Sequence, residues 1–407
     1  MIYKLNENVF YVKGYIKGAI YDLRLNQIYS LNERACEIMQ KLIYGLDLED
    51  DVEKSYVNAL KQKFDLNTDD KIIAISKEHF MKRDPSLDLL WLEVTQACNL
   101  KCVHCYEGDI HKHCNNGLNS YDWYNIVDQA KEIGVKNLVD IGGEPCLYRD
   151  INGLITKIVE NDMHATIVTN ATVISNSLMD LIIENKDKIS VKVSIYGPNA
   201  NIHENVTKVK GSFDKLVKNV RQLTNNGVKV KAAVIAMREN QDSLEETKDF
   251  VISIGMVYTR FDVIRNVFGG TQDLHTPTNK DLIKKCQYTK PLFLPSKEKF
   301  YRNQYENSCW SGKLVITETG DVLPCVFDRT NILGNICHKN LREIIDSNEV
   351  KRCWFMSFDN IEICKDCEYR FACKDCRPLA KAVNGTLNGK NPRCQYDPYT
   401  GVWNNEV

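Results

Sequence analysis

The chain has 407 residues, with 53 Lys and Arg against 54 Asp and Glu, so its formal net charge is -1. This balance argues against a general nucleic-acid binder, which usually carries a clear basic excess. No apolar run approaches the ~18 residues that span a bilayer, and Lys4, Glu7 and Lys13 stand where a signal peptide has its apolar core, so we expect a cytoplasmic protein without membrane contact.

Residues 1–86 are predicted to form a small winged-helix-like α+β module. Residues 9–14 and 18–32 have the pattern of strands with a turn at 24–27, and 32–46 predict a helix capped by Asn32. A second helix is predicted over 52–64. A module of this kind can bind a peptide along a strand edge or in a helix groove.

Residues 87–285 alternate short apolar strands with amphipathic helices, which is typical of an α/β fold with a parallel sheet. The six predicted strands are 89–95, 137–143, 164–170, 189–197, 230–237 and 259–266. The predicted helices are 120–134, 151–163, 176–187, 212–227 and 243–255. Six strands are too few for an eight-stranded barrel, and both an open sheet and a partial (β/α)6 TIM-like barrel fit. We take the partial barrel, with ligands at the carboxyl ends of its strands.

Cysteine is the unusual residue, with 16 copies in a long chain that has no sign of secretion, so metal or redox chemistry is expected. Cys98, Cys102 and Cys105 directly follow the first strand of the α/β unit. Three thiolates on one loop can bind three irons of a 4Fe–4S cluster and leave the fourth iron open to a ligand. Zinc is the alternative, but it usually takes four protein ligands in paired spacings.

The Cys98-x3-Cys102-x2-Cys105 pattern at the end of a first strand resembles the signature of radical S-adenosylmethionine (radical SAM) enzymes. The resemblance implies that the open iron chelates the amino and carboxylate groups of SAM. It also implies that one electron cleaves SAM to a 5′-deoxyadenosyl radical, which takes a hydrogen atom from the substrate.

Further residues match this family at later strand ends, and the resemblance implies their roles. Gly142, Gly143, Glu144 and Pro145 would contact the SAM amino group, and Asn170 and Ser194 would contact its ribose and methionine. The resemblance places Tyr106 and Val234 near the adenine. Where many relatives have an arginine facing the SAM carboxylate, this chain has Lys208 and Lys210, and Lys208 is taken as the contact.

Residues 286–407 are predicted to form a cysteine-rich third domain with a strand-like stretch at 313–325 and a short helix at 340–350, held together by metal. The spacing resembles a SPASM domain with two auxiliary 4Fe–4S clusters, although x2 replaces the usual x3 before Cys376. The resemblance assigns Cys309, Cys325 and Cys376 to the first cluster, with the fourth position open or filled by Cys286. It assigns to the second cluster Cys364, Cys367, Cys373 and Cys394. Zinc in the paired Cys-x2-Cys groups is the rival.

The sequence as a whole therefore resembles radical SAM peptide maturases that carry a module for recognising their precursor. We expect an enzyme with three clusters and SAM that cross-links a ribosomally made peptide, with a cysteine thioether as the leading product. Flavodoxin or ferredoxin would supply electrons. The alternatives are carbon–carbon or ether cross-links, formylglycine formation as in sulfatase maturation, and a metal-binding peptide scaffold without activity.

Overall fold

The computed structural model describes residues 1–66, 72–80, 86–105, 117–265, 267, 274–286, 296–306 and 308–404. Two compact units share the chain: 1–84 with 287–311 and 354–407 form the first, and 85–286 with 312–353 form the second. The predicted third domain, 286–407, is thus divided between the two units. No helix among the described residues is long and apolar enough to cross a membrane.

The second unit is built on a nine-stranded sheet whose first six strands are parallel and follow the chain order, as expected for a partial (β/α)6 barrel. These strands are β6 (Leu89–Thr95), β7 (Asn137–Gly142), β8 (His164–Thr169), β9 (Ile189–Ile195), β10 (Val230–Ala236) and β11 (Phe261–Val263). All six were predicted from the sequence. Because they are parallel, their carboxyl ends meet at one edge of the sheet.

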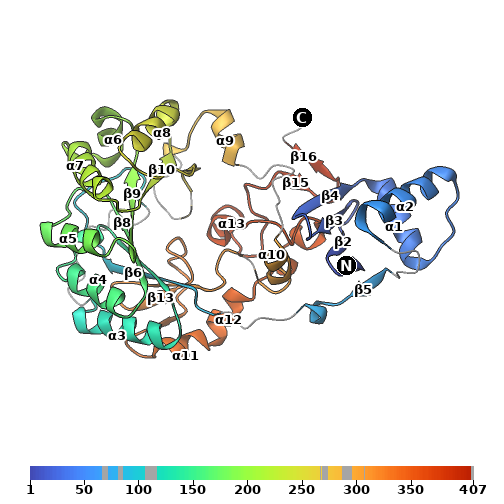
Figure 1. Cartoon of the computed structure of the whole chain (residues 1–407), viewed down its shortest axis with the longest axis horizontal. Coiled ribbons are helices and arrows are strands. Elements are labelled where there is room, and N and C mark those ends of the chain that lie inside the picture. The colour runs from blue at the N-terminus through green and yellow to red at the C-terminus, as the bar shows by residue number, and fades with distance from the viewer. Residues whose placement is uncertain are drawn as a thin grey trace. The chain divides into compact units, whose positions relative to one another are not determined.

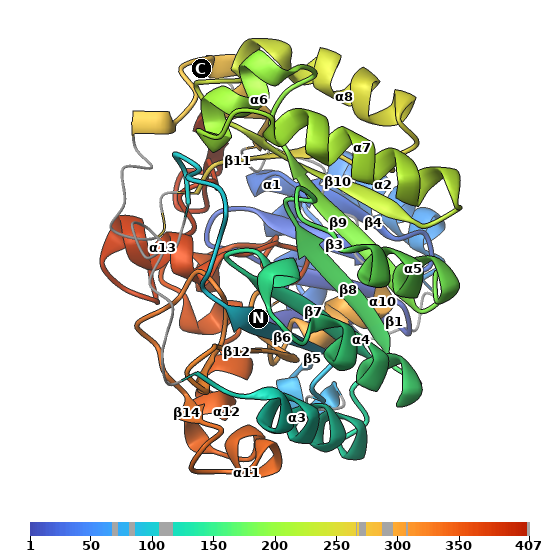
Figure 2. The same cartoon turned by 90° about the vertical axis from the view of Figure 1, so that its left-hand side faces the viewer.

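Helices connect the strands and lie along the outer face of the curved sheet (Figure 1, Figure 2). They are α3 (Ser120–Glu132), α4 (Ile151–Glu160), α5 (Asn176–Glu184), α6 (Ala200–Thr207), α7 (Ser212–Asn225) and α8 (Leu244–Ser253), followed by α9 (Lys280–Cys286). The sequence predicted all of those up to α8 except α6. On α3, Asn119 and Asp122 form a capping box, and Trp123, Ile126, Val127 and Ala130 make up its buried face.

The stretch predicted as strand-like at 313–325 extends this same sheet. β12 (Lys313–Ile316) pairs in parallel with β6, and β13 (Asp321–Leu323) and β14 (Gly334–Asn335) continue antiparallel from it. Val315 and Leu323 pack with Val139 and Ile141 in one buried cluster. This segment therefore belongs to the barrel unit, together with α11 (Leu341–Ile345) and most of α12 (Asn348–Trp354).

Asp140 lies in the middle of β7, where burial raises its pKa to about 7. Neither carboxylate oxygen accepts a hydrogen bond from another described residue. Since an unfolded aspartate titrates near pH 4, the folded state holds one extra proton between about pH 4 and about pH 7. The free energy of unfolding should therefore fall as the pH rises through this range. Asp140→Asn should flatten that dependence in denaturant titrations, and an unchanged slope would contradict the assignment.

The N-terminal part of the first unit is an antiparallel sheet in the order β4-β3-β2-β1-β5 with two helices. Its strands are β1 (Ile2–Asn6), β2 (Val9–Lys13), β3 (Gly18–Asp22), β4 (Gln27–Leu31) and β5 (Ile73–Ile75). The helices α1 (Glu33–Tyr44) and α2 (Asp51–Phe64) were predicted, and the Asn32 side chain caps α1 by accepting from the Ala35 amide at 2.9 Å. β1 and β5 were not predicted.

This module shares one hydrophobic core with the cysteine-rich segment. Phe300, on α10 (Lys297–Arg302), is fully buried and lies 5.0 Å from the Phe10 ring and 5.7 Å from the Phe371 ring, measured between centroids. The same cluster includes Tyr369 and Trp403, and Cys367 and Cys394 pack against it. The remaining elements of this unit are α13 (Arg377–Asn384), β15 (Tyr396–Asp397) and β16 (Val402–Trp403).

Candidate functional site

Cys98, Cys102 and Cys105 lie on the loop that follows β6, at the carboxyl edge of the barrel. The end of α6 fixes this loop, because the amides of Lys101 and Val103 each donate to its carbonyls at 3.0 Å. None of the three cysteines is in a disulfide, and each is partly buried. Burial, followed by the charges of its two neighbours, raises the pKa of Cys102 to about 12.

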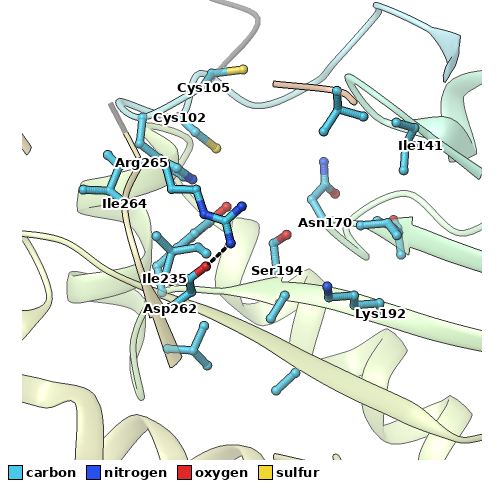
Figure 3. Close-up of a pocket in the computed structure, with 18 of the residues that line it drawn as sticks. Cys102, Cys105, Ile141, Asn170, Lys192, Ser194, Ile235, Asp262, Ile264 and Arg265 are labelled. Carbon is cyan, nitrogen blue, oxygen red and sulfur yellow. Dashed lines mark hydrogen bonds and ion pairs between the residues drawn. The ribbon is translucent and has the colours of Figure 1, made fainter. Parts of the chain in front are cut away.

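A cavity of about 540 Å³ opens beneath this loop (Figure 3). It is lined by the three cysteines and by five other residues that the sequence singled out, namely Gly142, Gly143, Asn170, Ser194 and Val234. These residues come from the ends of β6 to β10. The structure therefore brings most of the predicted cofactor residues into one cavity.

Gly142 and Gly143 allow the turn after β7 to contact the loop that leads to Cys98 closely. A Cβ on Gly142 would stand 2.1 Å from the Thr95 carbonyl oxygen, and its φ of 151° disfavours other residues. A Cβ on Gly143 would stand 2.5 Å from the Gln96 and Ala97 carbonyl oxygens. The two glycines let the backbones meet, so that the turn also supports the cysteine loop.

Glu144 is buried next to this cavity but does not line it. Its carboxylate accepts hydrogen bonds from the Thr169 hydroxyl at 2.6 Å, the Asn170 amide at 2.7 Å and the Cys146 amide at 3.0 Å. Pro145 is also buried and outside the lining. Glu144 thus ties the end of β8, including Asn170, to the turn after β7.

Glu144→Gln should lower the free energy of unfolding by about 1–3 kcal/mol, because the new amide group faces donors and leaves one of them buried without a partner. Thermal unfolding would measure this loss. Glu184→Gln is the matched control, since Glu184 is exposed on α5. Equal thermal-unfolding midpoints for the two variants would contradict the positioning role of Glu144.

Another predicted residue, Lys208, does not line the cavity. Lys208 ends α6 in a left-handed conformation and donates to the Asn205 side chain at 3.0 Å, and it is not among the lining residues. Its predicted contact with the SAM carboxylate therefore finds no support in the cavity lining. Tyr106 lies outside the described residues, as do Cys114 and the side chain of Cys286.

The donor set of the cavity suits an iron–sulfur cluster. Three thiols that are not in disulfides line it from one loop, and thiolates are the usual protein ligands of such clusters. Among the described residues, no group of three His, Cys, Asp or Glu side chains lies close enough together to hold a single metal ion. A cluster differs in this respect, because it distributes its ligands over several irons.

The four cysteines assigned to the second auxiliary cluster lie near one another in the first unit. Burial, followed by the charges of Cys394 and Cys364, raises the pKa of Cys373. Burial and then the charge of Cys394 raise the pKa of Cys364 to about 12. The pKa of Cys367 is raised by burial and then by the charge of Glu368, with smaller contributions from Cys373 and Cys364. The mutual influence of these thiols agrees with a shared cluster.

Of the three cysteines assigned to the first auxiliary cluster, two meet in the first unit. The Arg377 amide, directly after Cys376, donates to the Cys309 sulfur at 3.3 Å. Cys325 follows β13 in the second unit. The assignment of these three cysteines to one cluster stays a prediction.

The cavity also contains charged residues that the sequence analysis did not single out. They are Lys192 on β9, Asp262 on β11, and Arg260 and Arg265 at its two ends. One signal was available for Lys192: it precedes Ser194 by two residues on a strand, and side chains at this spacing share a face.

Comparison with known proteins identifies two domains in the chain. The radical SAM superfamily matches residues 92–251, and the iron–sulfur cluster-binding domain called SPASM matches residues 309–368. The chain contains a radical SAM domain and a SPASM domain. The first match contains the three cysteines of the cavity loop, and the second contains Cys309, Cys325, Cys364 and Cys367.

Relatives of this radical SAM protein differ in their activities. The antilisterial bacteriocin subtilosin biosynthesis protein AlbA of Bacillus subtilis is 25% identical over 64% of this chain and 60% of its own length. An AdoMet-dependent heme synthase of Methanosarcina barkeri is 24% identical over 76% of this chain and 97% of its own length. The match to the crystal structure of Streptococcus suis SuiB bound to precursor peptide SuiA covers 97% of this chain and 100% of the SuiB chain, with a TM-score of 0.61 and 17% sequence identity. At this identity, the SuiB structure shows a shared fold.

Proposed function

We propose that this radical SAM protein is a maturase that cross-links a ribosomally made precursor peptide. The observation that carries the proposal is the cavity, which combines the thiols of Cys98, Cys102 and Cys105 with the glycines, Asn170 and Ser194 at neighbouring strand ends. Two named similarities favour a peptide as the substrate: AlbA acts in the biosynthesis of a bacteriocin, and SuiB was crystallised with a precursor peptide.

Cys98, Cys102 and Cys105 would hold the cluster that binds SAM. Asn170 and Ser194 would contact the ribose and methionine of SAM, and the backbone near Val234 would lie beside its adenine. With cluster and SAM bound, the site would supply a 5′-deoxyadenosyl radical, and the auxiliary clusters would accept a further electron. The apolar lining of the cavity, which includes Ile141 and Val168, would keep competing reactants away from the substrate.

The leading product is a thioether. A C–H bond and a cysteine S–H bond of the peptide break, one C–S bond forms, and the peptide loses two hydrogens in total. The hydrogen atom from carbon leaves in 5′-deoxyadenosine. The thiol hydrogen leaves as a proton, and the electron that remains after the C–S bond forms is passed to an auxiliary cluster. Flavodoxin or ferredoxin in the cytoplasm would provide the electron that starts the reaction.

The N-terminal module would hold the leader of the precursor by strand addition. β4 ends the five-stranded sheet and has no strand partner on its outer edge among the described residues. An added strand can satisfy the backbone groups of such an edge. Holding the leader there would raise the effective concentration of the core peptide.

Anaerobic reconstitution tests the proposal. About twelve irons per chain and formation of 5′-deoxyadenosine are expected. Co-expression with the short reading frames beside the gene should then yield a peptide that has lost two hydrogens per cross-link. Formylglycine in a partner protein would favour the sulfatase-maturase alternative, and binding of peptide without SAM cleavage would favour a scaffold.

A further inference from the structure

Lys192 places an ammonium group inside the barrel cavity, where none of the described residues pairs with it. Its side chain comes from the middle of β9 and lines the cavity, and it is exposed there rather than packed (Figure 3). It makes no hydrogen bond and no ion pair with any described residue. A charge in such a place is open to a ligand.

The surroundings of Lys192 make an anion the favoured ligand. Although the side chain is open to the cavity, the cavity walls shield its ammonium group from bulk water. This desolvation, followed by the charges of Lys231 and Arg265, lowers the pKa of Lys192. Among the described residues, three cationic side chains and one anionic side chain line the cavity, and the anion, Asp262, pairs with Arg265 at 2.5 Å. A carboxylate beside Lys192 would offset this excess of positive charge.

The register of the sheet places Lys192 deeper in the barrel than the residues assigned to SAM. Lys192 pairs with Val168 on β8 and with Lys231 on β10, whereas Ser194 stands two residues closer to the carboxyl edge. Two residues along a strand correspond to about 7 Å. Asn170 follows the end of β8, also at that edge. A SAM molecule held at the edge would leave Lys192 to the substrate.

Arg265 completes one side of this deeper part of the cavity. Its guanidinium lies 5.4 Å from the centre of the Phe327 ring and forms an ion pair with Asp262. These two contacts hold the Arg265 side chain in place and neutralise its charge. Figure 3 shows the Arg265–Asp262 pair across the cavity from Lys192. A carboxylate that binds Arg265 would have to displace an existing ion pair, whereas one that binds Lys192, in the middle of β9, would not.

We propose that Lys192 binds a carboxylate of the peptide substrate, from an aspartate or glutamate side chain or from the peptide's carboxyl terminus, and so selects which residue lies beneath the cysteine loop. This inference rests on the proposed function, since it requires that a peptide enters the cavity. Lys192 is then a specificity-determining residue for the substrate.

Binding of two neutral-capped tripeptides to the reconstituted protein tests the proposal. The probes are acetyl-Gly-Glu-Gly-amide and acetyl-Gly-Gln-Gly-amide, compared by saturation-transfer NMR in the presence of SAM. The glutamate peptide should bind about tenfold more tightly, as expected for one charge-assisted contact. Lys192→Gln should remove this preference and Lys192→Arg should keep it. Lys215→Gln, a change of an exposed lysine on α7, should leave it unaltered.

Each other result would overturn the assignment. Equal affinities of the two peptides, no binding of either, or a glutamate preference that survives in Lys192→Gln would exclude a carboxylate contact at Lys192. A preference for the glutamate peptide that is seen without SAM and lost with SAM would indicate that Lys192 binds the SAM carboxylate instead. Binding is measured without turnover, so a failure of the maturase proposal, seen as absent SAM cleavage or absent cross-linking, remains a separate result.

Discussion

Cys102→Ala should abolish SAM cleavage and lower the iron bound after anaerobic reconstitution by about four per chain. Cys102 lies between Cys98 and Cys105 on the loop above the cavity, and a cluster held by these three thiolates would lose one of its ligands in this variant. Iron analysis and chromatography of 5′-deoxyadenosine measure the two effects. The remaining iron, about eight per chain, would belong to the auxiliary clusters.

Cys353→Ala is the matched control for this prediction. Cys353 is buried in the same unit, and its sulfur accepts a hydrogen bond from Asn331 at 3.5 Å, so it belongs to the packing rather than to the cavity. This variant should keep its full iron content and its SAM cleavage. Equal iron loss in both variants would mean that Cys102 acts through folding and not as a ligand.

Phe300→Ala should lower the free energy of unfolding by about 3–5 kcal/mol, the range for removing a fully buried aromatic side chain. It should also lower iron binding at the second auxiliary site. Phe300 contacts Phe10 and Tyr21 of the N-terminal sheet and Phe371 between two assigned cluster ligands. A cavity at this position would loosen the module and the cysteine segment together.

Thermal unfolding and iron analysis measure these effects, and Tyr44→Ala provides the comparison. Tyr44 belongs to the same module, at the end of α1, but is 67% exposed, so its loss should change neither quantity appreciably. If Phe300→Ala unfolded the N-terminal sheet while iron binding stayed complete, the shared core would not support the cluster segment.

The barrel was predictable because its signals are local. Each strand from β6 to β11 is a short apolar run bounded by turn residues, and the helices between them repeat apolar residues at helical spacing. α6 was missed because its eight residues, Ala200–Thr207, bury only His203, Val206 and Thr207 and show little apolar periodicity. α13 was missed because the cysteines around it suggested loops.

The site residues that directly follow strand ends were predictable from the sequence. Residues whose contacts depend on tertiary packing were less predictable. Gly142, Gly143, Asn170 and Ser194 line the cavity because parallel strands end at one edge. Glu144 faces donors of its own chain, which no spacing in the sequence reveals. The division of residues 286–407 between two units depends on the pairing of β12 with β6, a contact between segments more than 200 residues apart.

The central claim is that three cysteines hold a cluster with one iron free for SAM. Electron–nuclear double resonance on the reduced, reconstituted protein with SAM labelled by nitrogen-15 in its amino group tests this directly. A hyperfine coupling between the cluster and that nitrogen is the expected result, and it should disappear in Cys102→Ala. A cluster signal that shows no coupling to the label, or zinc in place of iron at Cys98, Cys102 and Cys105, would contradict the account.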